Sequence, residues 1–80
     1  METPKGIKDL MIRLERKEVD KPELIRLLNR VSKVPNFANS VAFFGHNIRL
    51  SRLRDLNCPE SEIEDTQAFL YSAFKIYYSK

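Results

Sequence analysis

The sequence is poor in the residues that build covalent or metal-held structure. Cys58 is the only cysteine and His46 the only histidine among 80 residues, and there is no tryptophan. A single thiol excludes an internal disulfide, and one imidazole does not supply the ligand set of a zinc site. We therefore expect a fold that depends on side-chain packing alone, in a reducing, cytoplasmic compartment.

Other absences restrict the class of protein further. No apolar run approaches the roughly 18 to 20 residues that span a bilayer, and residues 1–9 lack the apolar stretch of a secretion signal. With two glycines and no low-complexity tract, no linker divides the chain. Two separate cores would each be too small to fold, so residues 1–80 are predicted to form a single domain without a membrane span.

Catalytic chemistry has few candidate residues. Nothing beside Cys58 in the sequence resembles a nucleophile with its activating base, although a redox role for a thiol at a helix start is a third hypothesis. Four acidic residues crowd the start of the last predicted helix, namely Glu60, Glu62, Glu64 and Asp65. The helix dipole favours negative charge there, which explains them without a metal. We predict no enzyme, no metal site and no cofactor, and no small-molecule substrate is indicated.

The chain does contain prolines that mark four helix starts. Apolar residues at helical spacing follow each of them. The predicted helices span about 4–17, 21–33, 37–56 and 59–78. The expected fold is therefore all-α, a compact bundle of four helices with the C-terminal helix in the centre.

The first two predicted helices each carry one apolar stripe. The stripes consist of Ile7, Leu10, Met11 and Leu14 in the first helix and of Leu24, Leu27, Leu28 and Val31 in the second. Asp20 and Glu23 form the capping-box pattern of a helix start. Asp9 precedes Arg13 by four residues, the spacing of a surface ion pair. The short connection predicts an antiparallel or angled helical hairpin.

The third predicted helix, 37–56, changes its apolar face along its length. One stripe consists of Phe37, Val41, Phe44 and Ile48, and a second of Leu50, Leu53 and Leu56. Gly45 and Asn47 favour a kink or a break, so the helix is either continuous with two apolar faces or split near Gly45. Asn57 is predicted to end it in the left-handed conformation.

The last predicted helix has more apolar surface than its neighbours need to cover it. Its apolar positions occupy roughly 220° of the helical wheel, against the roughly 100° of an ordinary surface helix. Three flanking helices would bury most of this surface, and we interpret the rest as a docking site for a protein partner or a second copy. The predicted partner-binding residues are Tyr71, Tyr77 and Tyr78, with Arg49, Arg52, Leu53 and Leu56 from the third helix. Tyrosine is enriched at interfaces, and arginine binds acidic or phosphate-bearing partners.

Basic residues on the first two helices support an alternative function. They are Arg13, Arg16, Lys17, Arg26, Arg30 and Lys33. If the hairpin aligned them, they would neutralise phosphates, although no aromatic residue is interleaved for base stacking. The first hypothesis is a non-enzymatic intracellular protein–protein interaction module, such as an adaptor or a small regulatory or accessory subunit. The alternative is a nucleic-acid-binding accessory domain.

Overall fold

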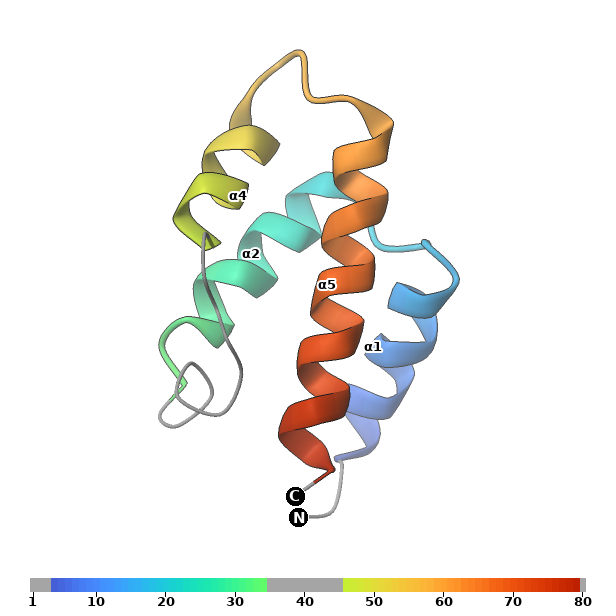
Figure 1. Cartoon of the computed structure of the whole chain (residues 1–80). Coiled ribbons are helices and arrows are strands. Elements are labelled where there is room, and N and C mark those ends of the chain that lie inside the picture. Colours follow the sequence, from blue (N-terminus) through green and yellow to red (C-terminus); the bar gives the residue numbers. More distant parts are fainter. Residues whose placement is uncertain (1–3, 35–45, 80) are drawn as a thin grey trace.

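The computed structural model of the chain describes residues 4–34 and 46–79 (Figure 1). Helices account for most of both ranges: α1 (Lys5–Glu15), α2 (Lys21–Val31), α4 (His46–Arg54) and α5 (Glu60–Tyr78). The described part of the chain is all-α, which confirms the predicted fold class. The stripe residues Phe37, Val41 and Phe44, and the continuity of the third predicted helix through Gly45, lie outside the described residues.

Helix α5 is the central helix of the bundle, as predicted. In Figure 1 it runs along the length of the molecule, with α1 on one side of it and α2 and α4 on the other. It contacts all three, and α2 also contacts α4. Because the main contacts of α1 are with α5, the predicted hairpin of the first two helices is not the packing unit. The wide apolar surface of α5 explains this arrangement, since no single neighbour could cover it.

The core draws side chains from every described helix. Its buried apolar members are Leu14, Val19, Leu24, Leu28, Val31, Leu50, Leu53, Leu70, Ala73 and Phe74. The stripes predicted for α1 and α2 are confirmed, because their remaining members are half-buried and pack against this cluster. On α5 most of the apolar residues do the same, whereas Ile76 is half exposed.

Helix α1 ends two residues earlier than predicted, in a backbone turn that starts at Lys17. The Lys17 amide donates to the Leu14 carbonyl at 3.1 Å and the Glu18 amide to the Arg13 carbonyl at 2.9 Å. This is the Schellman pattern, and it requires the left-handed conformation that Lys17 adopts with φ of 60°. The turn leads the chain to Val19, which is buried and donates its amide to Gln67 Oε1 at 2.8 Å.

The start of α2 confirms one half of the predicted capping box. Asp20 Oδ1 accepts from the Glu23 amide at 3.1 Å. The Glu23 carboxylate accepts two hydrogen bonds from Arg13, at 2.8 and 3.0 Å. Arg13 thus forms a bidentate ion pair with a residue of α2 and joins the two helices. The sequence had predicted Asp9, within α1, as its partner. The hydrogen bonds from Arg13 lower the pKa of Glu23.

Replacement of Glu23 by glutamine is expected to weaken the acid dependence of stability. A carboxyl group with a lowered pKa stabilises the fold above its ordinary pKa of about 4.5, and this stabilisation is lost as the pH falls through the lowered value. The free energy of unfolding, measured with urea, should fall less between about pH 6 and about pH 3 in Glu23→Gln than in the wild type. Glu64→Gln, which removes an exposed carboxylate, should keep the wild-type drop; equal drops in all three proteins would contradict the assignment.

Helix α4 ends at Arg54, and Leu56 lies beyond it in the turn that leads to α5. Asp55 forms this turn, because its Oδ1 accepts from the Asn57 amide at 2.9 Å and its carbonyl accepts from the Cys58 amide at 3.1 Å. Asn57 is not left-handed, contrary to the prediction, since Asp55 closes the turn instead. The predicted core residue Ile48 is 60% exposed, because α4 turns Leu50 and Leu53 toward α2 and α5.

Candidate docking groove at the C-terminal end of α5

The two arginines of α4 that were predicted to bind a partner contact α5 of the same chain. The Arg49 guanidinium carbon lies 4.6 Å from the centroid of the Phe69 ring, and Arg49 also donates to Thr66 Oγ1 at 3.4 Å. Arg52 pairs with Glu62 at 3.1 Å. A cation over an aromatic face and an ion pair at the next turn both hold α4 against α5. Their side chains are therefore part of the helix packing.

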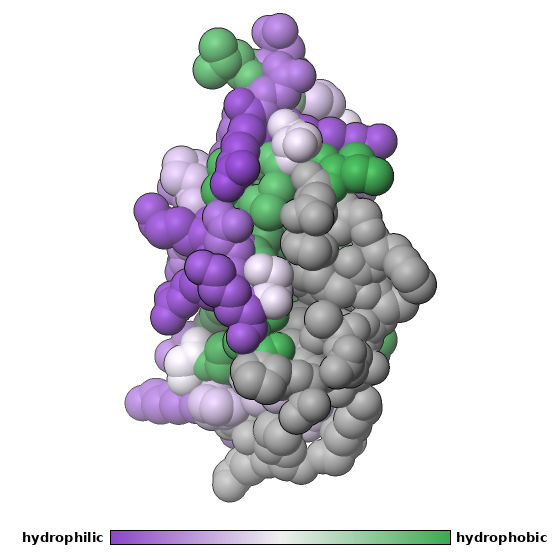
Figure 2. Space-filling view, turned by 90° about the vertical axis from the view of Figure 1, so that its left-hand side faces the viewer, coloured by the Kyte–Doolittle hydropathy of each residue, from purple (hydrophilic) through white to green (hydrophobic). Residues whose placement is uncertain are grey.

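The two leucines predicted for the same face have opposite environments. Leu53 is completely buried and offers no exposed surface to a partner, contrary to what the sequence suggested. It points into the core because α4 packs on two helices at once. Leu56 is 97% exposed, and Figure 2 shows apolar atoms standing clear of the surface at the upper end of the molecule, where the turn between α4 and α5 lies. The Arg/Leu face is thus not one continuous surface.

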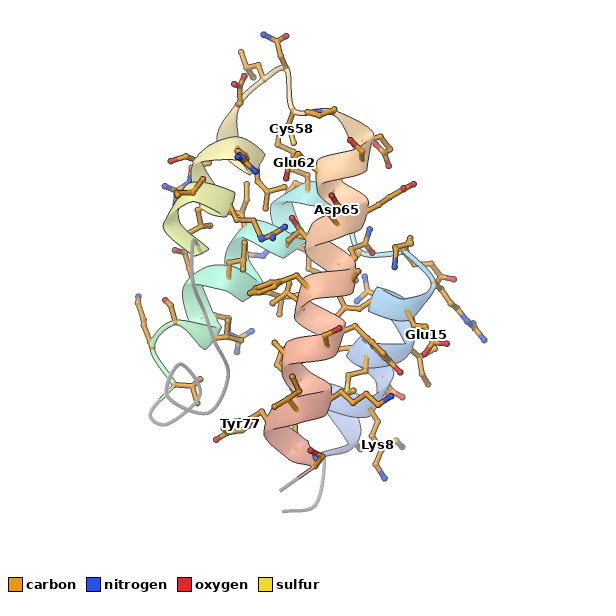
Figure 3. The ribbon with its side chains drawn as sticks, in the orientation of Figure 1. Lys8, Glu15, Cys58, Glu62, Asp65 and Tyr77 are labelled. Atoms are coloured by element: carbon orange, nitrogen blue, oxygen red, sulfur yellow. The ribbon has the colours of Figure 1, made fainter. Side chains whose placement is uncertain are left out.

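Tyr71 joins α5 to α1. It is half-buried, and the interaction of its hydroxyl with the Glu15 carboxylate raises the pKa of Tyr71. Figure 3 shows Glu15 on the part of α1 that lies beside α5. Tyr71 therefore has a partner within the chain.

Tyr77 and Tyr78 pack against each other at the end of α5. Their ring centroids are 4.9 Å apart with the planes nearly perpendicular, and the Tyr78 ring stacks on Phe74 at 6.3 Å. Both tyrosines are half-buried. Burial raises the pKa of Tyr78, since the phenolate is poorly solvated there. These two rings form one wall of an apolar groove.

The groove lies among the first half of α1, the second half of α2 and the last turns of α5, and its volume is about 450 Å³. Its lining residues are Pro4, Gly6, Ile7, Leu10, Leu27, Arg30, Val31, Val34, Phe74, Tyr77 and Tyr78. Apolar side chains predominate, and the polar groups are the Arg30 guanidinium and the two phenols. A groove of a few hundred Å³ with an apolar lining and few polar groups is typical of a binding site.

The end of the molecule that contains the groove carries an excess of positive charge. The charged residues that line it, or are one position from a lining residue, are Lys5, Lys8, Arg26, Arg30, Lys33, Lys75 and Asp9. The rest of the described chain carries seven basic and nine acidic residues. Figure 3 shows Lys8 and Tyr77 at the end of the molecule opposite Cys58 and Glu62. The apolar groove and the excess of positive charge thus occupy the same end.

The basic residues proposed for nucleic-acid binding do not form one surface. Arg13 is held by Glu23. Arg16 and Lys17 follow the end of α1, whereas Arg30 and Lys33 lie at the end of α2, on the other side of α5 in Figure 1. Of the six residues, Arg30 is the one that lines the groove.

The remaining candidate residues form no recognisable reaction centre in the described ranges. Cys58 is half-buried, and its thiol donates a weak hydrogen bond to the Pro59 carbonyl at 3.6 Å. In residues 4–34 and 46–79, no three His, Cys, Asp or Glu side chains are grouped to hold a metal ion. No helix of the described chain is long and apolar enough to cross a bilayer.

Most of the groove lining was not singled out from the sequence as functional. Ile7, Leu10, Leu27 and Val31 are members of the predicted core stripes, and their spacing is the same whether a helix covers them or leaves them open. Tyr77 and Tyr78 are the predicted partner-binding residues that the structure places in the lining. One further signal in the sequence was Gly6. A glycine inside a predicted helix has no side chain and so leaves space beside that helix. Comparison of the chain with protein-family models, with curated proteins and with solved structures finds no match.

Proposed function

We propose that this protein is a non-enzymatic intracellular interaction module, an adaptor or small accessory subunit, whose docking site is the groove at the C-terminal end of α5. The observation that carries the proposal is an apolar groove of about 450 Å³ walled by two tyrosines. Concave apolar surface is unfavourable in water, and tyrosines are enriched where partners bind.

The site differs from the one expected from the sequence. The tyrosines at the end of α5 stay in the proposal, whereas Arg49, Arg52 and Tyr71 have partners within the chain and Leu53 is buried. Among the lining residues that the structure describes, the titratable groups are a guanidinium and two phenols. Such a lining suits recognition, in which apolar contacts supply affinity and a few polar groups fix orientation.

A substitution at Gly6 tests the proposal without risk to the fold. A Cβ added to Gly6 meets no atom within 4 Å, and glycine is a poor helix former, so Gly6→Leu and Gly6→Ala should both fold at least as well as the wild type. The leucine brings a bulky side chain to the groove, and the alanine leaves most of the groove open. Matched thermal unfolding curves verify that both proteins fold.

The measurement is photo-crosslinking from a benzoylphenylalanine at position 77, with a second probe at the exposed Glu64 as the position control. The expected result is one defined crosslinked protein that the Tyr77 probe captures in the wild type and in Gly6→Ala. In Gly6→Leu the yield of this crosslinked product should fall at least about tenfold. That change corresponds to a loss of about 1.4 kcal/mol in binding free energy. Equal capture by Gly6→Leu, or equal capture from position 64, would overturn the groove as the docking site.

A further inference from the structure

Resting on the proposed function, we infer that the groove accepts an acidic amphipathic helix of a partner protein, with its apolar face in the groove and its carboxylates toward Arg30 and the other basic residues at this end of the molecule. The first argument is charge. Arg30 lines the groove, and five further Lys or Arg and one Asp lie one position along the chain from a lining residue, whereas acidic residues outnumber basic ones over the rest of the described chain. An acidic segment gains attraction at this end, and a basic one is repelled.

The second argument is shape. The groove is partly enclosed, and Phe74, Tyr77 and Tyr78 from the final turns of α5 line it. Its volume corresponds to about 15 waters at about 30 Å³ each, room for more than one large side chain. A helix presents such side chains at positions i, i+3 or i+4, and i+7, whereas a flat bilayer surface leaves a concavity unfilled.

A second copy of the chain is a poorer occupant for two reasons. Two grooves placed face to face would bring like charges together, which costs free energy. Outside the groove, the exposed large apolar side chains of the described residues are spread over α1, α4, the turn after α4 and α5; they are Ile12, Ile48, Leu56 and Ile76. Burial of any one of them yields about 1.5–3 kcal/mol, less than the cost of at least about 4 kcal/mol for association. We therefore expect a monomer at micromolar concentration.

Two synthetic helical peptides test the inference directly. Both have about 18 residues and the same leucines at i, i+3, i+4 and i+7; one carries glutamate at the remaining positions and the other lysine. Fluorescence anisotropy at about 50 mM and about 500 mM salt measures their binding to the full chain. The acidic peptide is expected to bind at least about tenfold more tightly than the basic one, and its affinity should fall at least about tenfold at high salt.

A pair of charge reversals locates the interaction. Arg30 and Arg54 are both exposed and both lie in the last turn of a helix, but only Arg30 lines the groove. Arg30→Glu should weaken binding of the acidic peptide about tenfold. Arg54→Glu should weaken it less than about twofold, since exposed charges beyond the screening length of about 8 Å contribute little. Gly6→Leu should abolish the binding, and Gly6→Ala should keep it.

The outcomes separate this inference from the proposed function. If both peptides bind equally well and Gly6→Leu blocks both, the groove is a docking site but its preference for acidic helices is wrong. If neither peptide binds, or the two arginine variants behave alike, the inferred occupant is wrong. Binding to phosphatidylserine vesicles or to duplex DNA that needs Arg30, without binding of the acidic peptide, would likewise overturn it in favour of a lipid or a nucleic acid.

Discussion

Leu53→Ala is expected to lower the free energy of unfolding by about 2–5 kcal/mol, the usual cost of truncating a fully buried leucine. Leu53 has no exposed surface and sits where α4 meets both α2 and α5. Alanine there removes apolar contacts and leaves a cavity that three helices cannot easily fill. A domain of 80 residues has a total stability of only about 4–12 kcal/mol, so the variant should be partly unfolded at 37 °C.

Leu56→Ala is the matched control for this prediction. The two leucines are three positions apart, but Leu56 is 97% exposed, and its truncation should change stability by less than about 0.5 kcal/mol. Urea unfolding followed by circular dichroism measures both variants. Similar stabilities for the two proteins would show that Leu53 is not in the core, and would return it to the list of surface residues that a partner can contact.

Gln67→Met is expected to lower the free energy of unfolding by about 1–3 kcal/mol. Gln67 is 2% exposed, and its side-chain oxygen accepts the buried Val19 amide at 2.8 Å. Methionine has a similar length and similar helix propensity, so the main change is that the Val19 amide loses its acceptor. The substitution should also remove the hydrogen bond that connects the segment between α1 and α2 to α5.

Hydrogen exchange at the Val19 amide gives a local test of this hydrogen bond. The amide should exchange faster in Gln67→Met relative to the amides of α5 around it, because its protection comes from the glutamine. Ala68→Met, at an exposed position of the same helix, should change stability by less than about 0.5 kcal/mol. An unchanged exchange rate at Val19 in Gln67→Met would contradict this role of the glutamine.

Gln67 illustrates what pattern analysis missed inside the core. A glutamine on a helix is usually solvent-exposed, so its position on α5 raised no expectation of burial. Its burial depends on the turn at Lys17, which brings the Val19 amide to α5. No local rule predicts a left-handed lysine, because the conformation is unfavourable for a residue with a Cβ and persists here through the surrounding hydrogen bonds.

The arginines of α4 illustrate a second feature that sequence patterns do not predict, namely which helix a side chain contacts. The sequence places Arg49 and Arg52 beside apolar residues, and that pattern fits both a docking face and contacts with another helix of the same chain. The structure pairs them with Phe69 and Glu62 of α5. The distinction depends on which face of α5 meets α4, and helical periodicity carries no information about that choice.

Local sequence was sufficient for the elements themselves. Proline, the Asp20 cap and apolar residues at helical spacing predicted three of the described helices to within two residues at each end, since these signals act over a single turn. They also predicted a central α5, because its apolar surface was too wide for one neighbour. The remaining features come from packing: Leu53 is buried and Leu56 exposed, Arg13 binds Glu23, and an open groove lies within the basic end. Those depend on how helices distant in sequence cover one another, and a one-turn pattern is the same for an apolar side chain that is covered and for one that is left open.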